Sequence, residues 1–210
     1  MPSQEAADRV RPLVDAFSGT VHVVKPRHSK WGDFRPSFRG SPARIRINSD
    51  LPAESFLVTL LHELAHAHVE EAWVRGPEPK TLLQKWGLRR RVPRPLPHGV
   101  EWQNAYAALL RPFLEASIFS FVVAQALQKN VHKPKASCGA DTALLKALMP
   151  HQIAGFTVSD VQEGSQFRLE NGRRFIKGPK RRTRFACTDC ESGRTFAVHP
   201  LASALLIDPV

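Results

Sequence analysis

Residues 56–66 read FLVTLLHELAH and lie in the middle of a stretch with helical periodicity. We expect Ser49 or Asp50 to cap the N-terminus of this helix and Gly76 to end it. Its apolar side chains recur at the spacing of one broad helix face: Phe56, Leu57, Leu60, Leu61, Leu64 and Ala65. The sequence therefore predicts a core helix over about residues 52–74.

The residues before this helix predict a small sheet. The stretches 20–25 and 43–48 alternate in polarity, and the second alternates Arg and Ile, which is typical of a strand with one buried face. The segment between them, residues 26–42, is basic and rich in Gly, Pro and aromatic residues, and we interpret it as a loop. An amphipathic helix over residues 5–17 is expected to precede the first strand.

The residues after the core helix predict further helices and then a β module. An irregular excursion at 79–97 contains three consecutive arginines and several prolines. The expected helices cover residues 81–86, 99–110, 113–129 and 141–149, with Pro112 separating the second from the third.

From residue 156 onward, short Phe- and Val-containing runs alternate with Gly-bearing turns, which predicts a small antiparallel β module. The chain is thus expected to be an α+β protein with two domains, residues 1–150 and 156–205.

The core helix also carries the pattern HExxH, as His62-Glu63-Leu64-Ala65-His66. Two histidines four positions apart lie on one face of a helix, about one turn apart, where both imidazoles can bind one metal ion. The acid beside the first histidine is placed to take a proton from water bound to that ion. We therefore expect one catalytic Zn²⁺, with His62 and His66 as ligands and Glu63 as general base.

A catalytic zinc needs a third protein ligand and an open fourth position. His68 lies on nearly the opposite helix face, Glu71 is offset in angle, and Glu70 is about 12 Å along the axis from His62. His98 follows the Pro-rich excursion and starts a new helix, so it is expected to fold back and complete the site.

Composition limits the class of protein. There are 30 Lys and Arg residues against 19 Asp and Glu, so the formal net charge is +11, which favours nucleic acid or nucleoprotein partners. We see no long apolar run and no secretory signal, and three cysteines do not make a disulfide framework. The sequence predicts a cytoplasmic protein without a membrane segment, associated with the nucleoid.

Positive charge is concentrated in three clusters with aromatic residues among them, a composition that suits phosphates and unpaired bases. The first cluster comprises Lys25, Arg27, Lys30, Arg35, Arg39, Arg44 and Arg46. The second comprises Arg89, Arg90, Arg91 and Arg94. The third comprises Arg173, Arg174, Lys177, Lys180, Arg181, Arg182 and Arg184.

The motif regions resemble the SprT-like, Spartan-related family of zinc metallopeptidases. The resemblance is carried by HELAH at residues 62–66, HGVEW at 98–102, NSDL at 48–51 and KWGDFR at 30–35. It implies a zincin-like fold with the motif helix packed on a small sheet, and zinc on His62, His66 and His98. It also implies Glu63 as general base and an association with DNA.

The chain departs from the family pattern near its end. Several SprT-like proteins carry a zinc ribbon with two cysteine pairs, whereas this chain has one CxxC pair, Cys187 and Cys190, with Cys138 far away. We expect the β module to be free of metal.

The leading hypothesis is a zinc-dependent endopeptidase that acts on DNA-associated proteins. A nucleic-acid-binding or transcription-associated accessory protein with a structural zinc is the first alternative, and a different zinc hydrolase such as an amidase is the second. An intact Glu63 favours the enzyme, because a structural site needs no general base.

Overall fold

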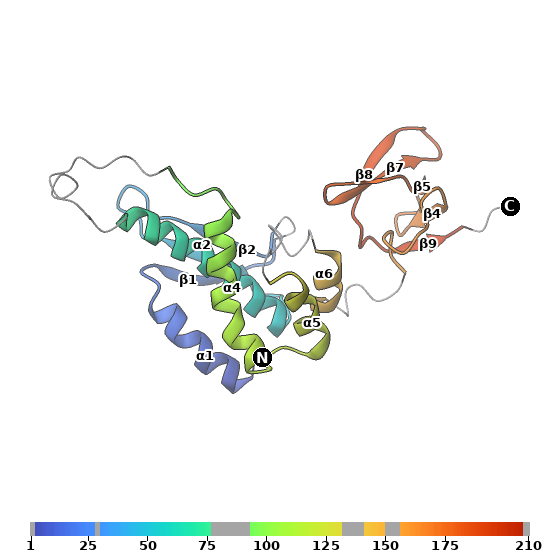
Figure 1. Cartoon of the computed structure of the whole chain (residues 1–210). Helices are drawn as coiled ribbons and strands as arrows, with labels where there is room; N and C mark the ends of the chain where they lie inside the picture. The colour runs from blue at the N-terminus through green and yellow to red at the C-terminus, as the bar shows by residue number, and fades with distance from the viewer. Residues whose placement is uncertain (1–2, 28–29, 77–92, 132–140, 150–155, 208–210) are drawn as a thin grey trace. The chain divides into compact units, whose positions relative to one another are not determined.

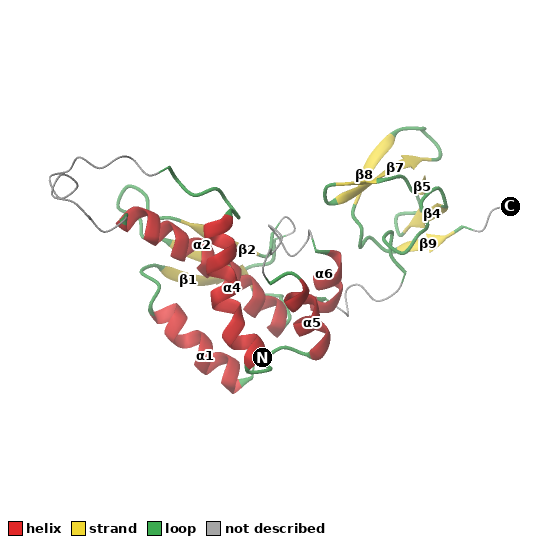
Figure 2. Cartoon of the chain, viewed as in Figure 1, coloured by secondary structure: helices red, strands yellow, loops and turns green. Residues whose placement is uncertain are grey.

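The computed structural model describes residues 3–27, 30–76, 93–131, 141–149 and 156–207 (Figure 1). The protein is α+β, as expected, and its described residues form five helices and nine strands (Figure 2). The chain divides into two compact units, Met1–Ala136 and Ser137–Val210. Helix α6 (Thr142–Leu148), which we expected in the first domain, belongs to the second unit.

The first unit is built on a mixed three-stranded sheet. The central strand is β3 (Arg44–Asn48), with β1 (Thr20–Val24) parallel to it on one side and β2 (Gly32–Arg35) antiparallel on the other. Ile45 and Ile47 are fully buried, so the arginines that alternate with them in β3 lie on the opposite face.

Helices on the buried face of this sheet contribute to its core. Helix α1 (Gln4–Asp15) contributes partly buried side chains, and helix α2 (Ala53–Arg75) contributes the fully buried ones. The core cluster consists of Phe17, Ile45, Ile47, Leu60, Leu64 and Ala67. The apolar residues of the stretch 56–66 are therefore buried in the core or packed against it, as their helical spacing predicts.

Strand β2 corrects one expectation, because it lies within the segment that we interpreted as a loop. Its sequence GDFR shows no apolar alternation, so periodicity does not reveal it. It is a short edge strand that is held by backbone pairing to β3. The expected cap of α2 is also wrong: Pro52 occupies the N-cap position, without a side-chain cap hydrogen bond. Ser49 instead extends the sheet, because its N–H donates to the carbonyl of Val24 at 2.9 Å.

Helix α4 (Val100–Glu115) packs on α2 and corrects a second expectation, because it continues through Pro112. Phe113, only 1% exposed, holds this last turn in the core, and packing outweighs the proline. The break comes later, at a turn where Ser117 has a φ of 52°. Helix α5 (Phe121–Lys129) then starts anew, with the hydroxyl of Ser120 donating to Glu54 at 3.0 Å.

The second unit holds the expected antiparallel β module. Its main path of strands runs β6-β7-β5-β4-β9, and β8 pairs with β7. The strands are β4 (Gln166–Leu169), β5 (Arg174–Ile176), β6 (Lys180–Arg181), β7 (Arg184–Asp189), β8 (Thr195–Val198) and β9 (Ala204–Leu206). Their core contains Val158, Val161, Phe167, Phe175, Cys187, Val198 and Ala204.

Among the described helices, none combines the length and the apolar character that a bilayer span requires.

Candidate metal centre

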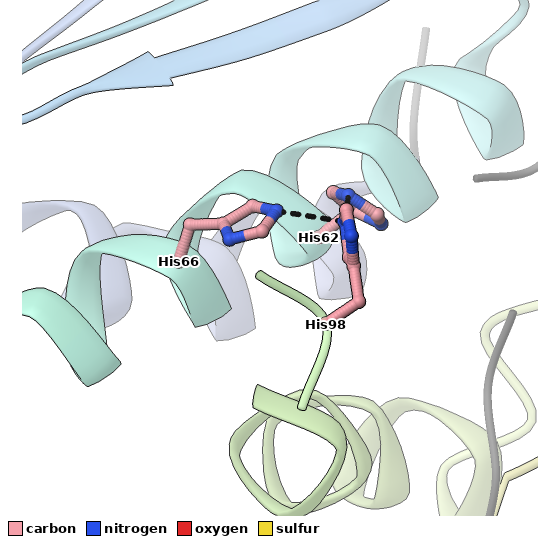
Figure 3. Close-up of side chains that lie close together, drawn as sticks. All are labelled: His62, His66 and His98. Carbon is pink, nitrogen blue, oxygen red and sulfur yellow. Dashed lines mark hydrogen bonds between the residues drawn. The ribbon is translucent and has the colours of Figure 1, made fainter. Parts of the chain in front are cut away.

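Helix α2 places His62 and His66 on one side, and the turn before α4 brings His98 against them (Figure 3). The Nε2 atom of His98 lies 3.0 Å from Nε2 of His66 and 3.2 Å from Nε2 of His62. The three ligand atoms all lie within 4.8 Å of one another. The structure thus brings together the three histidines that the sequence singled out.

These separations fit one small cation. Tetrahedral zinc has Zn–N bonds of about 2.0–2.1 Å, so two of its nitrogen ligands are separated by about 3.3 Å. The two Nε2 separations at His98 are within a few tenths of an ångström of that value. An ion held by these three imidazoles would keep one tetrahedral position open, which is the arrangement of catalytic zinc sites rather than structural ones.

His98 has an unusual backbone conformation at the turn that brings its ring against His62 and His66. Its φ of 58° lies in the left-handed region, which is rare for residues other than glycine. The next residue is Gly99, where an added Cβ would lie 3.0 Å from the carbonyl oxygen of Leu96. The amide of Gln103 donates to the His98 carbonyl at 3.1 Å and ties this turn to the first turn of α4.

Burial disfavours the protonated form of all three imidazoles, and the unprotonated ring nitrogen is the form that binds a metal. Burial, with the neighbouring charges of His66 and His98, lowers the pKa of His62 to about 3. Burial and His98 lower the pKa of His66 to about 4, and burial lowers the pKa of His98.

Two aromatic side chains of α4 pack against the imidazole rings. The ring of Trp102, only 1% exposed, lies 4.7 Å from that of His62 and 4.6 Å from that of His98. Tyr106 stacks on Trp102 at 5.1 Å and lies 5.9 Å from the His62 ring. Trp102 also donates from Nε1 to the His62 carbonyl at 3.4 Å. These rings restrict the orientations of the imidazoles, a function that the sequence did not assign to Trp102.

The segment before His98 is fixed to α2 by Arg94. Its guanidinium donates to Glu70 at 2.7 Å and lies 5.3 Å from the centre of the Trp73 ring. Glu70, one turn beyond His66, is therefore the partner of an arginine and not a fourth group at the metal centre.

Glu63 faces away from bulk solvent and against the edge strand. It is 7% exposed, and its carboxylate accepts a hydrogen bond from the backbone of Phe34 in β2. Burial raises the pKa of Glu63 to about 7, and the charge of Asp33 adds to this effect. Gly32 leaves the space that this side chain fills, because an added Cβ would lie 3.1 Å from both Cγ and Oε1 of Glu63.

The strand beside Glu63 carries one carboxylate among several cations. Asp33 forms ion pairs with Arg27, with Arg46 at 2.8 Å, with Arg35 at 3.5 Å and with Lys30 at 3.6 Å. Burial alone would raise the pKa of Asp33, but hydrogen bonds from Arg46 and Arg27 and the charge of Lys30 outweigh it. The result is a pKa of about 2.

The other candidate ligands lie elsewhere. His68 is exposed, and Glu71 accepts a hydrogen bond from the hydroxyl of Ser18 at 2.6 Å. In the second unit, Cys187 is buried in the core and Cys190 is exposed. Several features predicted from the sequence lie outside the described part of the chain: the helix at residues 81–86, Arg89, Arg90, Arg91 and Cys138.

Comparisons of this chain with protein-family models, with curated proteins and with solved structures found no match.

Proposed function

We propose that this protein is a zinc-dependent endopeptidase of SprT-like type that acts on proteins associated with DNA. The observation that supports it most is the convergence of three imidazoles from α2 and the turn before α4, together with a buried glutamate that follows the first of them in sequence. Donor chemistry supports zinc, because imidazole nitrogen suits zinc and other transition metals whereas calcium and magnesium prefer oxygen.

In this proposal His62, His66 and His98 hold the ion, and Glu63 acts as the general base. Zinc supplies a Lewis acid that polarises a peptide carbonyl and lowers the pKa of water. Glu63 takes the proton from the attacking water and delivers it to the leaving amine. Its burial between α2 and β2 suits that task, because the carboxylate is held in one position and shielded from solvent.

The DNA-associated substrate is supported by charge. The formal net charge of +11 attracts polyanions, and the basic residues of β2 and β3 belong to the same unit as the histidines. A protein held on DNA near this unit would reach the site at a raised local concentration.

The test uses purified full-length protein and its Glu63→Gln variant. Elemental analysis is expected to find one zinc per chain in both proteins, since Glu63 is not a ligand. Only the wild type is expected to cleave a protein crosslinked to DNA. Equal cleavage by Glu63→Gln would contradict the general base, and bound zinc without any cleavage would favour an accessory protein with a structural metal.

A further inference from the structure

The solvent-facing side of the three-stranded sheet carries a surplus of positive charge. Its cross-strand rows are defined by the pairing of β2, β3 and β1. One row of this outer face holds Asp33, Arg46 and His22, and the next holds Arg35, Arg44 and Thr20. A third row holds Asn48 and Val24, and Asn48 is buried. Ile45 and Ile47 point to the opposite, buried face, which fixes the assignment.

One row places two arginines directly opposite each other. Arg35 in β2 pairs in register with Arg44 in β3, and both are exposed. Like charges in this position lie about 5 Å apart at Cβ and destabilise a sheet. Among the ion pairs between described residues, Arg35 shares Asp33 with three other cations, and Arg44 takes part in none.

The outer face is therefore far from neutral. Asp33 is the partner of Arg27, Lys30, Arg35 and Arg46, and Arg44 adds a further cation. One carboxylate cannot neutralise five cations, so the surface keeps a strong positive potential. Four of the five are arginines, whose planar guanidinium groups bind phosphate oxygens in a bidentate manner.

The connection between β2 and β3 adds an aromatic ring. Phe38 and Ser41 exchange backbone hydrogen bonds of 3.0 and 2.9 Å around Arg39 and Gly40, which have φ values of 45° and 83°. Positive φ at both central residues makes a tight two-residue hairpin turn. The ring of Phe38 is 67% exposed, and the Arg39 guanidinium lies 5.1 Å from its centre.

We propose that this outer face, with the hairpin tip Phe38–Ser41, binds the phosphate backbone of a nucleic acid strand. The inference deepens the DNA-associated function proposed above and rests on it for its biological sense. Arginines on neighbouring strands contact phosphates, and the exposed ring offers a stacking surface for an unpaired base. The surface lies on the side of the sheet opposite the core helices, so a bound strand leaves the buried face of α2 undisturbed.

The test compares two double variants with the same change in charge. In Arg35→Gln/Arg44→Gln the outer face loses two cations, whereas in Arg11→Gln/Arg111→Gln two exposed arginines of α1 and α4 are removed. Affinity for a fluorescent duplex oligonucleotide is measured by anisotropy over a range of salt concentrations. Each lost phosphate contact lowers the salt slope by about 0.9.

The outer-face variant is expected to bind roughly tenfold more weakly, with a salt slope lower by about 1.8, while the control variant keeps both values near those of the wild type. Phe38→Ala is expected to weaken binding of a single strand more than of a duplex. Zinc content and thermal midpoint, measured on every variant, show that the fold is intact.

Equal losses in the two double variants would overturn the inference, because net charge alone would then explain binding. Binding to phosphatidylserine vesicles but not to oligonucleotides would overturn it in favour of a membrane surface. The peptidase is judged separately, by Glu63-dependent cleavage of an unstructured protein without DNA. A chain that cleaves but does not bind DNA therefore refutes only the surface, and one that binds but does not cleave refutes only the enzyme.

Discussion

Gly32 in the edge strand lies so close to Glu63 in α2 that a larger residue at position 32 would press on the Glu63 side chain. A Cβ on Gly32 would lie 3.1 Å from both Cγ and Oε1 of Glu63, and 2.6 Å from Cγ2 of Thr59. This glycine is required by close approach and not by a positive φ. The position of the proposed general base is therefore set by the edge strand as well as by its own helix.

Gly32→Ala is expected to lower kcat by at least tenfold. The added methyl group displaces the Glu63 carboxylate, and small misplacements of a catalytic group are costly. Zinc content is expected to stay at one per chain, since none of the three histidines touches Gly32 in the described contacts. Steady-state cleavage kinetics and elemental analysis measure the two effects.

Removing the methyl group of Thr59 provides the matched control. Thr59→Ser deletes the atom that the new Cβ would meet at 2.6 Å and keeps a hydroxyl that can donate to the Ser55 carbonyl. The double variant Gly32→Ala/Thr59→Ser should regain most of the thermal stability lost in Gly32→Ala and little of its activity. Full recovery of activity would show that the strand does not position Glu63.

His98→Ala is expected to weaken zinc binding by roughly 100-fold or more, since loss of a direct ligand exceeds the usual effect of an outer partner. The variant should also lose the rise in thermal midpoint that added zinc produces in the wild type, because a metal that binds only the folded chain stabilises it by mass action. Competition with a chromogenic chelator measures the affinity. His68→Ala, an exposed histidine of the same helix, is the control and should bind zinc normally.

The sequence predicted the grouping of His62, His66 and His98 for two reasons. Helix periodicity places His62 and His66 on one face, and His98 begins the next expected helix after the Pro-rich excursion. The grouping is confirmed to the extent that their ligand atoms meet, whereas the identity of the metal stays a prediction. The contacts of Trp102 and Gly32 with the site could not be predicted from the sequence. They depend on how α4 and β2 pack against α2, which no periodicity encodes.

The same distinction explains the errors in the fold. The alternation of Arg and Ile in β3 allowed that strand to be predicted. The four residues of β2 form an edge strand only because they pair with β3, and no alternation in their sequence indicates it. Pro112 signals a helix end on local grounds, yet the buried ring of Phe113 extends α4 beyond it. In both cases tertiary contacts outweighed local propensity.

Acid is expected to destabilise the first unit through Asp33. Its folded pKa of about 2 lies below the ordinary value of 3.8, so the carboxylate stabilises the fold above pH 4, and this contribution is lost as pH falls from 4 to 2. The full shift corresponds to about 2 kcal/mol, which screening by water reduces to about 1 kcal/mol. The groups that face Asp33 are Arg27, Lys30, Arg35 and Arg46, with the Glu63 carboxyl nearby.

Urea denaturation followed by tryptophan fluorescence measures this loss, because all four tryptophans precede residue 103. Asp33→Asn should be less stable than the wild type at pH 7 and should show a shallower decline between pH 4 and 2. Parallel declines in the two proteins would assign the acid sensitivity to other carboxylates.

Lys177→Met is expected to destabilise the second unit by about 2 kcal/mol. Lys177 is 6% exposed, and its ammonium donates to the carbonyls of Ser159 and Val161 and lies 4.1 Å from the centre of the Phe185 ring. Its removal leaves buried acceptors without a donor. Hydrogen exchange of the β5 and β7 amides measures the effect, and Lys180→Met, an exposed lysine nearby, should leave it unchanged.

Arg94→Ala is expected to weaken zinc binding a few-fold, with a change in unfolding free energy below about 1 kcal/mol because the pair is partly exposed. Arg94 holds the segment before His98 against Glu70 and Trp73 on α2, so without it that segment samples more positions and the third ligand is less ordered. Glu70→Gln should have a similar, smaller effect. Arg94→Lys keeps the charge but loses the planar group that donates to Glu70 and lies over Trp73, so it should recover only part of the affinity. If the two single variants and Arg94→Ala/Glu70→Gln gave additive losses, the tether between these residues would not exist, because a shared contact is lost only once.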